Sequence, residues 1–331
     1  MNLIVSANTS LDRVLVVPEF QVNRVHRVER EYSVAGGKAL NVFRALRTWG
    51  DHRSQAVVTV GGLTGAVARR LLTEEGLDAS CRFVEVRGAT RQCDIVVDSK
   101  ALTSTVVNGR GPELSPQEVS ALTTAINQSL ACRHFDHLVL TGSLPPNLPV
   151  GWYAELIEAA RDHGTQAVLD AAGEVLYDGA LARPWMIKVN RAEFVGLVQA
   201  WPEHRDRDPG QTESVDRVAR ALIERGTAWV IVTNGADPTL VWGRQGRWQV
   251  SGPALQRAVN PIGSGDAFLA GVMAGYGRFG RLEEALKWAS AAAESNARSI
   301  LPEVAPTSEL DRSAEAVRVT FHPGRLTGVD Q

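Results

Sequence analysis

The sequence predicts an α/β protein: a mostly parallel sheet covered by helices on both faces, with a small β-sheet inserted as a lid. Two observations lead to this fold class. Short apolar, β-branched runs alternate with helical patterns along most of the 331 residues, and in two places paired strand patterns have no helix between them. Unbroken apolar runs are typical of strands buried on both faces. The predicted strands of the main sheet cover 3–5, 56–60, 138–140, 167–169, 186–189 and 229–232.

Helices are predicted between these strands from the spacing of apolar residues. Ser115-Pro116-Gln117-Glu118 is a capping box with proline at the first helical position, and apolar residues follow at helical spacing as far as Leu130. The same spacing predicts helices over 152–160, 215–223, 267–276 and 282–293. Sheets of this kind place ligands beyond the carboxyl ends of their strands, so functional residues are expected there.

The two interruptions define the inserted sheet. Residues 13–17 with 25–33, and 92–98 with 103–108, have the pattern of strands joined without a helix, which predicts a mostly antiparallel lid. Segment 202–212 is rich in charge, Pro and Gly and is predicted to be a surface loop. The expected division is an α/β core of residues 1–11, 34–89 and 109–331 and a lid of residues 12–33 and 90–108.

Composition and charge argue against several classes of protein. Lys plus Arg number 35 and Asp plus Glu 37, so the formal net charge of −2 disfavours a general nucleic-acid or anionic-membrane surface. Cys81, Cys93 and Cys132 fit neither a disulfide framework nor a zinc site, which favours a reducing cytoplasm. No apolar stretch reaches the ~18 residues that a membrane span needs. A soluble cytoplasmic protein is expected, with neither nucleic acid nor membrane as a partner.

The motifs of several common enzyme classes are absent from the sequence. It has no P-loop, no G-x-G-x-x-G after a strand, no H-E-x-x-H and no G-x-S-x-G. P-loop enzymes, dehydrogenases, zinc proteases and serine esterases of those types are therefore disfavoured.

The most informative stretch is Asn260-Pro261-Ile262-Gly263-Ser264-Gly265-Asp266, which leads directly into an apolar helix. Glycines let backbone N–H groups approach an anion, and the first turn of a helix offers unpaired N–H groups and a positive dipole end. Beside such an anion hole, Asp266 could act as a proton acceptor that faces an incoming nucleophile. A simpler role, in which Asp266 or Ser264 only caps the helix, is the more common one for such residues.

A second glycine-led helix start is Gly36-Gly37-Lys38-Ala39-Leu40-Asn41. A cation in the first turn opposes the helix dipole, so Lys38 is poorly placed unless an anionic ligand lies there too. A solvated surface lysine is the alternative. Polar residues also follow four of the predicted strands. Any one such group is more often a turn or a cap than a site, but four at corresponding strand ends make a stronger case for a site. These groups are Asn8-Thr9-Ser10 with Asp12, Thr141-Gly142-Ser143, Asn190 with Glu193, and Thr233-Asn234-Gly235.

Four motifs carry a resemblance to a known family: AGGKALNVFRALRTWG at 35–50, TGSLPPNLP at 141–149, IKVNRAEF at 187–194 and NPIGSGDAFLAG at 260–271. In this order they resemble the ribokinase/PfkB family of carbohydrate kinases, most closely its phosphosugar branch of 1-phosphofructokinases and tagatose-6-phosphate kinases. The resemblance implies a Rossmann-like ribokinase fold with a lid over the sugar. It also implies transfer of the ATP γ-phosphoryl group to a sugar hydroxyl with Mg²⁺.

The resemblance also implies roles for individual residues. Asp266 would be the catalytic base, and the backbone N–H groups of Gly263, Ser264, Gly265 and Asp266 would form the anion hole. Lids of related proteins pair across a dimer, which implies a homodimer through residues 13–33 and 92–108.

On the sugar side, the resemblance implies that Asp12, Gly37 and Asn41 hold sugar hydroxyls. Lys38 and Arg91 would bind the phosphate that the sugar already carries.

On the nucleotide side, the resemblance implies that Asn190 and Glu193 position Mg²⁺ and its waters, Glu193 acting through water. Thr233 and Gly235 would lie against the nucleotide phosphates, and Asn296 would border the adenine pocket.

The sequence departs from the family pattern at four positions: Ala39, Val189, Asn234 and Cys93, the last where Asn often faces the sugar. The substrate is therefore the least certain implication, with fructose 1-phosphate ahead of tagatose 6-phosphate or fructose 6-phosphate. A kinase of an unphosphorylated sugar or nucleoside is one alternative. A catalytically idle sugar or nucleotide sensor is another, although it would have no need of a base.

Overall fold

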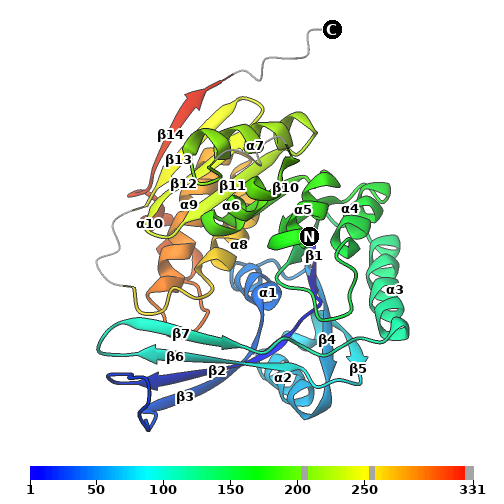
Figure 1. Cartoon of the computed structure of the whole chain (residues 1–331), viewed down its shortest axis with the longest axis vertical. Helices are drawn as coiled ribbons and strands as arrows, with labels where there is room; N and C mark the ends of the chain where they lie inside the picture. The colour runs from blue at the N-terminus through cyan, green and yellow to red at the C-terminus, as the bar shows by residue number, and fades with distance from the viewer. Residues whose placement is uncertain (203–207, 253–257, 325–331) are drawn as a thin grey trace.

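The main sheet is mixed and runs through the whole molecule. The computed structural model describes residues 1–202, 208–252 and 258–324 (Figure 1). Over these residues ten strands form one sheet in the order β14-β13-β12-β11-β10-β9-β8-β1-β4-β5. Their bounds are β1 Asn2–Ser6, β4 Gln55–Gly61, β5 Cys81–Val86, β8 His137–Thr141, β9 Gln166–Asp170, β10 Met186–Asn190, β11 Trp229–Asn234, β12 Asp237–Gly243, β13 Gly246–Ser251 and β14 Arg318–Pro323.

Seven neighbouring strands, from β11 to β5, pair in parallel, and the predicted parallel sheet is confirmed. In the central strand β1, Ile4 pairs with Ala56 of β4 on one side and with Val139 of β8 on the other. The sequence analysis missed β5 and the antiparallel edge formed by β12, β13 and β14. These strands are short or partly exposed, so they lack the unbroken apolar run that marks a buried strand.

Helices cover both faces of the sheet, because alternate strand residues point to opposite sides. Leu3 and Val5 belong to the core beneath one set of helices, whereas Ile4 belongs to the core beneath the other. The first set is α3 Pro116–Cys132, α4 Trp152–Asp162, α5 Gly173–Leu181, α6 Arg191–Ala200 and α7 Thr212–Glu224. The second set is α1 Lys38–Thr48, α2 Gly62–Glu74, α8 Ser264–Phe279 and α9 Leu282–Ala297, with α10 Thr307–Ala314 packed on α9. No helix in the described ranges is long and apolar enough to cross a membrane.

The lid is a separate sheet beside α1 and α2 (Figure 1). Its strands, in order across the sheet, are β3 Arg30–Gly36, β2 Ser10–Val17, β6 Arg91–Asp98 and β7 Thr103–Asn108. Strands β2 and β6 are parallel and the other pairs antiparallel, as predicted.

Two predicted boundaries need correction. The strand expected at 25–33 begins only at Arg30 and continues to Gly36. Val25 is 98% exposed and Val28 is 43% exposed, so the valines at 25–28 have no core to face and form no strand. The predicted loop at 202–212 lies partly outside the described residues, and α7 already begins at Thr212. The division of the chain into core and lid by residue number stays a prediction.

The underside of the lid packs against the core. Val14, Ile95 and Val97 of the lid form an apolar cluster with residues that include Ile262 and Ile300. Across the same contact, the Ser104 Oγ lies 3.1 Å from Asn260 Oδ1. The lid is thereby joined to the segment that leads into helix α8.

Candidate active site

Helix α8 begins with an open turn of backbone. Gly263 precedes its first residue with a φ of 87°, a left-handed conformation that favours glycine. The N–H groups of Ser264 and Asp266 donate to Pro261 O at 3.1 Å and Gly263 O at 3.0 Å. The N–H groups of Gly263 and Gly265 have no hydrogen-bond partner in the described part of the chain. These two donors, at the positive end of a helix, form an anion hole.

Asp266 does not cap the helix, because α8 has no side-chain cap. The carboxylate is buried, and its Oδ2 accepts a hydrogen bond of 2.9 Å from the Asn41 Nδ2 of helix α1. Burial raises the pKa of Asp266 to about 6, although the positive charges of Lys38 and Lys188 oppose the shift. Above that pH the side chain is an ionised, desolvated carboxylate beside the anion hole, which suits a general base.

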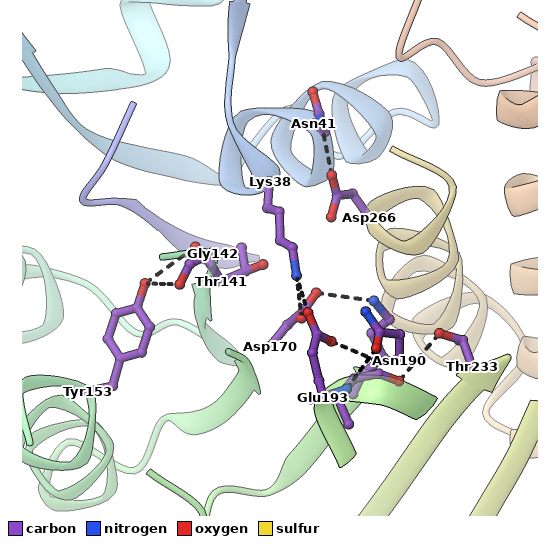
Figure 2. Close-up of polar contacts among 12 residues, drawn as sticks. Lys38, Asn41, Thr141, Gly142, Tyr153, Asp170, Asn190, Glu193, Thr233 and Asp266 are labelled. Atoms are coloured by element: carbon purple, nitrogen blue, oxygen red, sulfur yellow. Dashed lines mark hydrogen bonds and ion pairs between the residues drawn. The ribbon is translucent and has the colours of Figure 1, made fainter. Parts of the chain in front are cut away.

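Lys38 extends from the start of α1 toward two carboxylates (Figure 2). Its Nζ lies 3.0 Å from Asp170 Oδ1 and 3.3 Å from Glu193 Oε1. Burial alone would lower the pKa of Lys38, but the charges of Asp170, Asp266 and Glu193 raise it above its ordinary value. Lys38 is therefore an ion-paired cation of the site, with a side chain that is 36% exposed.

Asp170 is itself shared between two lysines. It is fully buried at the end of β9, and its Oδ2 lies 3.1 Å from the Nζ of Lys188, a residue of β10 that is also buried. The penalty of burial raises the pKa of Asp170, but the two lysines outweigh it and hold the pKa below its usual value. Asp170 is an anion in the folded protein.

The residues predicted to bind the sugar lie where the lid joins the core. Asp12 of β2 accepts a 2.5 Å hydrogen bond from the Ser10 hydroxyl, and burial raises its pKa. Arg91 of β6 donates from Nε to the Asn8 carbonyl at 3.0 Å and from Nη1 to Cys93 Sγ at 3.4 Å. None of the ion pairs found among the described residues includes Arg91, so its charge is available to a ligand.

Of the residues predicted for the nucleotide side, Asn190, Glu193 and Thr233 lie at the ends of β10 and β11 (Figure 2). Asn190 and Glu193 form a capping box: each side chain accepts a 2.8 Å hydrogen bond from the other residue's backbone N–H. Thr233 pairs with Asn190 across the sheet and donates its hydroxyl to Val189 O at 3.3 Å. Gly235 lies in the exposed turn after β11.

The structure joins some of the predicted residues by direct contacts and leaves others apart. Asn41 contacts Asp266, and Lys38 contacts Glu193. Asn296 lies beneath the anion-hole turn, where its Oδ1 accepts a 3.1 Å hydrogen bond from the Ser264 hydroxyl. By contrast, no hydrogen bond or ion pair within the described ranges links Lys38 to Arg91. Gly37 begins α1 with a φ of 103°, the turn that brings Lys38 into the site.

Comparison with known proteins identifies the family. A model of the pfkB family of carbohydrate kinases matches residues 1–302. The chain belongs to this family. It is 31% identical to a 1-phosphofructokinase of Bacillus subtilis (strain 168) over 284 residues, which are 86% of this chain and 88% of that protein.

Solved structures agree with this assignment. The crystal structure of a possible 1-phosphofructokinase from Thermotoga maritima superposes with a TM-score of 0.86 at 25% identity, covering 97% of this chain and 99% of that chain. A ribokinase from the same organism shares the fold, with a TM-score of 0.72 at 17% identity over 95% of this chain and 99% of that one. The expected ribokinase fold is confirmed.

Magnesium is the usual metal partner of ATP in kinases, and the residues of this pfkB kinase fit a weakly held ion. No group of three or more His, Cys, Asp or Glu side chains in the described ranges could enclose a metal. Glu193, beside the exposed Asn190, still offers carboxylate oxygens at the edge of the site. Mg²⁺ is commonly bound through one or two carboxylates, with water and substrate phosphates completing its shell.

Two residues of the kinase site escaped the sequence analysis, Asp170 and Lys188. Both had a signal. Asp170 directly follows the predicted strand 167–169, the position where the other polar groups were found, and Lys188 is a charged residue inside an apolar strand. A charge at a buried strand position requires a partner, and Asp170 on the neighbouring strand is that partner.

Proposed function

We propose that this kinase transfers the γ-phosphoryl group of ATP to a hydroxyl of a phosphorylated ketohexose, with fructose 1-phosphate the first choice. The observation that carries the proposal is the guanidinium of Arg91, which forms no ion pair among the described residues and lies close to Asp12, a residue that would hold sugar hydroxyls. A buried phosphate requires matched positive charge, and arginine suits it well. The relative from Bacillus subtilis, named a 1-phosphofructokinase, supports the same choice.

The proposed mechanism divides the chemistry among few groups. Asp266 accepts the proton of the attacking sugar hydroxyl, and Asn41 orients that carboxylate through its 2.9 Å hydrogen bond. The Asn41 Oδ1 is buried without a partner among the described residues and can accept from a sugar hydroxyl. The N–H groups of Gly263 and Gly265 stabilise charge on the transferred group. Asn190 and Glu193 would position Mg²⁺ and its waters, Glu193 acting through water, and the ion would supply positive charge against the phosphates.

A substrate panel tests the proposal. We would measure kcat/KM by coupled ADP detection for fructose 1-phosphate, tagatose 6-phosphate and fructose 6-phosphate, and for free fructose, tagatose, ribose and a nucleoside. The expected result is a strong preference for a phosphosugar. A wild-type preference for an unphosphorylated acceptor would overturn the proposal in favour of a sugar or nucleoside kinase, and no turnover on any acceptor would favour a sensor.

The Arg91→Ala variant is expected to raise KM for the phosphosugar about 10- to 150-fold, because a charge-assisted contact contributes about 1.5–3 kcal/mol. KM for ATP should change little. Lys38→Ala should raise the sugar KM similarly and also lower kcat, since Lys38 contacts Asp170 and Glu193. The matched control is Arg87→Ala, which removes an exposed arginine. An unchanged KM in Arg91→Ala would contradict the phosphate contact.

We further propose that the kinase forms a homodimer through its lid. The lid's edge strand β7 is largely exposed, including Val107 at 64%, and unpaired strand edges favour association unless they are covered. The phosphofructokinase-2 of Escherichia coli, which shares this fold, has been solved in a tetrameric inhibited form.

Sedimentation is expected to show a dimer at micromolar protein, and Val107→Asp should shift it toward monomer because it places a charge in the apolar contact. Val67→Asp, at an exposed valine of α2, is the control and should leave the dimer intact. A wild-type monomer with and without the sugar would contradict the lid dimer.

A further inference from the structure

One buried carboxylate lies between two lysines of the site. The two oxygens of Asp170 have different partners: Oδ1 is 3.0 Å from the Lys38 Nζ, and Oδ2 is 3.1 Å from the Lys188 Nζ. Like charges repel strongly in a protein interior, so two ammonium groups that touch the same residue need an anion between them. Asp170 supplies that anion, and each of its two oxygens contacts one of the two ammonium groups.

Lys188 faces the anion-hole turn. Its side chain is 3% exposed, and Asp170 is the one hydrogen-bond acceptor that the described residues offer its ammonium group. A Cβ atom added at Gly265 would lie 2.9 Å from the Lys188 Nζ. An ammonium has three donors, so two N–H groups of Lys188 remain for a group that arrives beside Gly265.

Lys38 reaches the same carboxylate from helix α1 (Figure 2). Glu193 also contacts the Lys38 ammonium group, at 3.3 Å, but Glu193 belongs to the capping box of α6 as well, and its side chain is 17% exposed, whereas that of Asp170 is fully buried. Asp170 is therefore the more rigid of the two anchors.

We infer that Asp170 is a positioning residue for phosphoryl transfer, whose single carboxylate fixes the Lys188 ammonium group at the anion hole and the Lys38 ammonium group beside Glu193. The inference rests on the proposed kinase function and adds a residue to it. Asp170 acts through the two lysines and does not itself meet the substrates. Holding charged donors in place before the reaction is where much of the rate acceleration in such sites arises.

Asp170 also contributes to the charge around the base. The groups that act on Asp266 are Lys38 and Asn41 from α1, Lys188 from β10 and Asp170 from β9. Burial is the largest influence and raises the pKa of Asp266 to about 6. The two lysines lower the pKa, and the negative charge of Asp170 raises it. A neutral residue at 170 removes one contribution that raises the pKa, so the base would ionise at a lower pH.

The other groups near Asp170 do not reverse the expected lowering of the Asp266 pKa. Tyr153 of α4 donates its hydroxyl to Thr141 O at 3.3 Å, and burial followed by the charge of Asp170 raises its pKa above the ordinary value. The phenol is therefore neutral throughout the relevant range. Glu193 on α6 meets Asp170 only through Lys38.

The test is Asp170→Asn, assayed with whichever acceptor wild type uses best. We expect kcat to fall about 10²-fold, the scale of a misplaced reacting group, with a smaller change in either KM. The acidic limb of the kcat/KM profile should move to lower pH. The matched control is Asp216→Asn, which removes a part-buried carboxylate of α7 that accepts a 2.7 Å hydrogen bond from Trp242 Nε1. The control should lose thermal stability and keep its pH profile.

A second variant covers the case in which Asp170→Asn fails to fold because Lys188 is left uncompensated. Asp170→Asn with Lys188→Met removes both buried charges, which should restore folding while kcat stays low. Full kcat in either folded variant, or an unmoved acidic limb in Asp170→Asn, would overturn the positioning role. Because the assay uses the preferred acceptor, a failed substrate assignment and a failed role for Asp170 give different results.

Discussion

Replacing Asp266 with Asn is expected to lower kcat by about 10²- to 10⁴-fold with little change in either KM, because the variant keeps the shape of the side chain and loses the proton acceptor. The amide oxygen at 266 can still accept the hydrogen bond that Asn41 donates at 2.9 Å. Local structure should therefore survive. The measurement is steady-state kinetics with the preferred sugar, beside the thermal stability of both proteins.

The role of Asp266 as the base also predicts the direction in which the rate changes with pH. A base works only when ionised, and burial raises the pKa of Asp266 to about 6, so wild-type kcat/KM should fall as the pH drops below about 6. The residual activity of Asp266→Asn should lack that limb. Asp216→Asn again serves as the control, because it changes the same atoms on α7. A variant at 266 with near-wild-type kcat would show that Asp266 is not the base.

Replacing Gly265 with Ala is expected to lower kcat by about 10²- to 10³-fold, the usual effect of losing one donor to the transferred group, here the Lys188 ammonium group. The new methyl group would meet the Lys188 Nζ at 2.9 Å, so it would displace that ammonium group and crowd the free N–H of residue 265. Kinetics with the preferred sugar and with varied ATP check the result.

The same helix provides a matched control. Gly277 also lies in α8, and a Cβ added there meets no atom within 4 Å. Gly277→Ala should leave kcat unchanged and stabilise the protein by about 0.4–1 kcal/mol, since alanine restricts the unfolded chain. Equal losses of activity in both alanine variants would point to helix α8 as a whole rather than to the anion hole.

The sequence predicted the parallel sheet well, because its strands are unbroken apolar runs such as Leu138-Val139-Leu140 with strong helical patterns between them. The prediction failed where the pattern of apolar residues does not match their burial. Val25 and Val28 are β-branched residues of the kind that favour strands, yet both are exposed. The antiparallel edge was missed for the opposite reason, since β14 is a strand with mostly exposed residues.

For the site, motifs located the glycine turns and Asp266, because special backbone conformations and charged helix starts can be recognised locally. The contacts of Lys38 could not be predicted in the same way. Its carboxylate partners, Asp170 and Glu193, lie 132 and 155 residues further along the chain. Only the arrangement of parallel strand ends brings them together. The periodicity of a sequence does not predict the order of the strands in the sheet.

The apolar cluster beneath the lid bears on how a kinase limits the hydrolysis of ATP by water. Ile262 immediately precedes the Gly263 of the anion hole and is covered by lid residues that include Val14 and Ile95. Raising the lid would wet these side chains and break the contact between Ser104 and Asn260. The turn that receives the phosphoryl group is then fully supported only while the lid is down, with solvent excluded. We therefore expect the contacts that join the lid to this turn to disfavour hydrolysis of ATP.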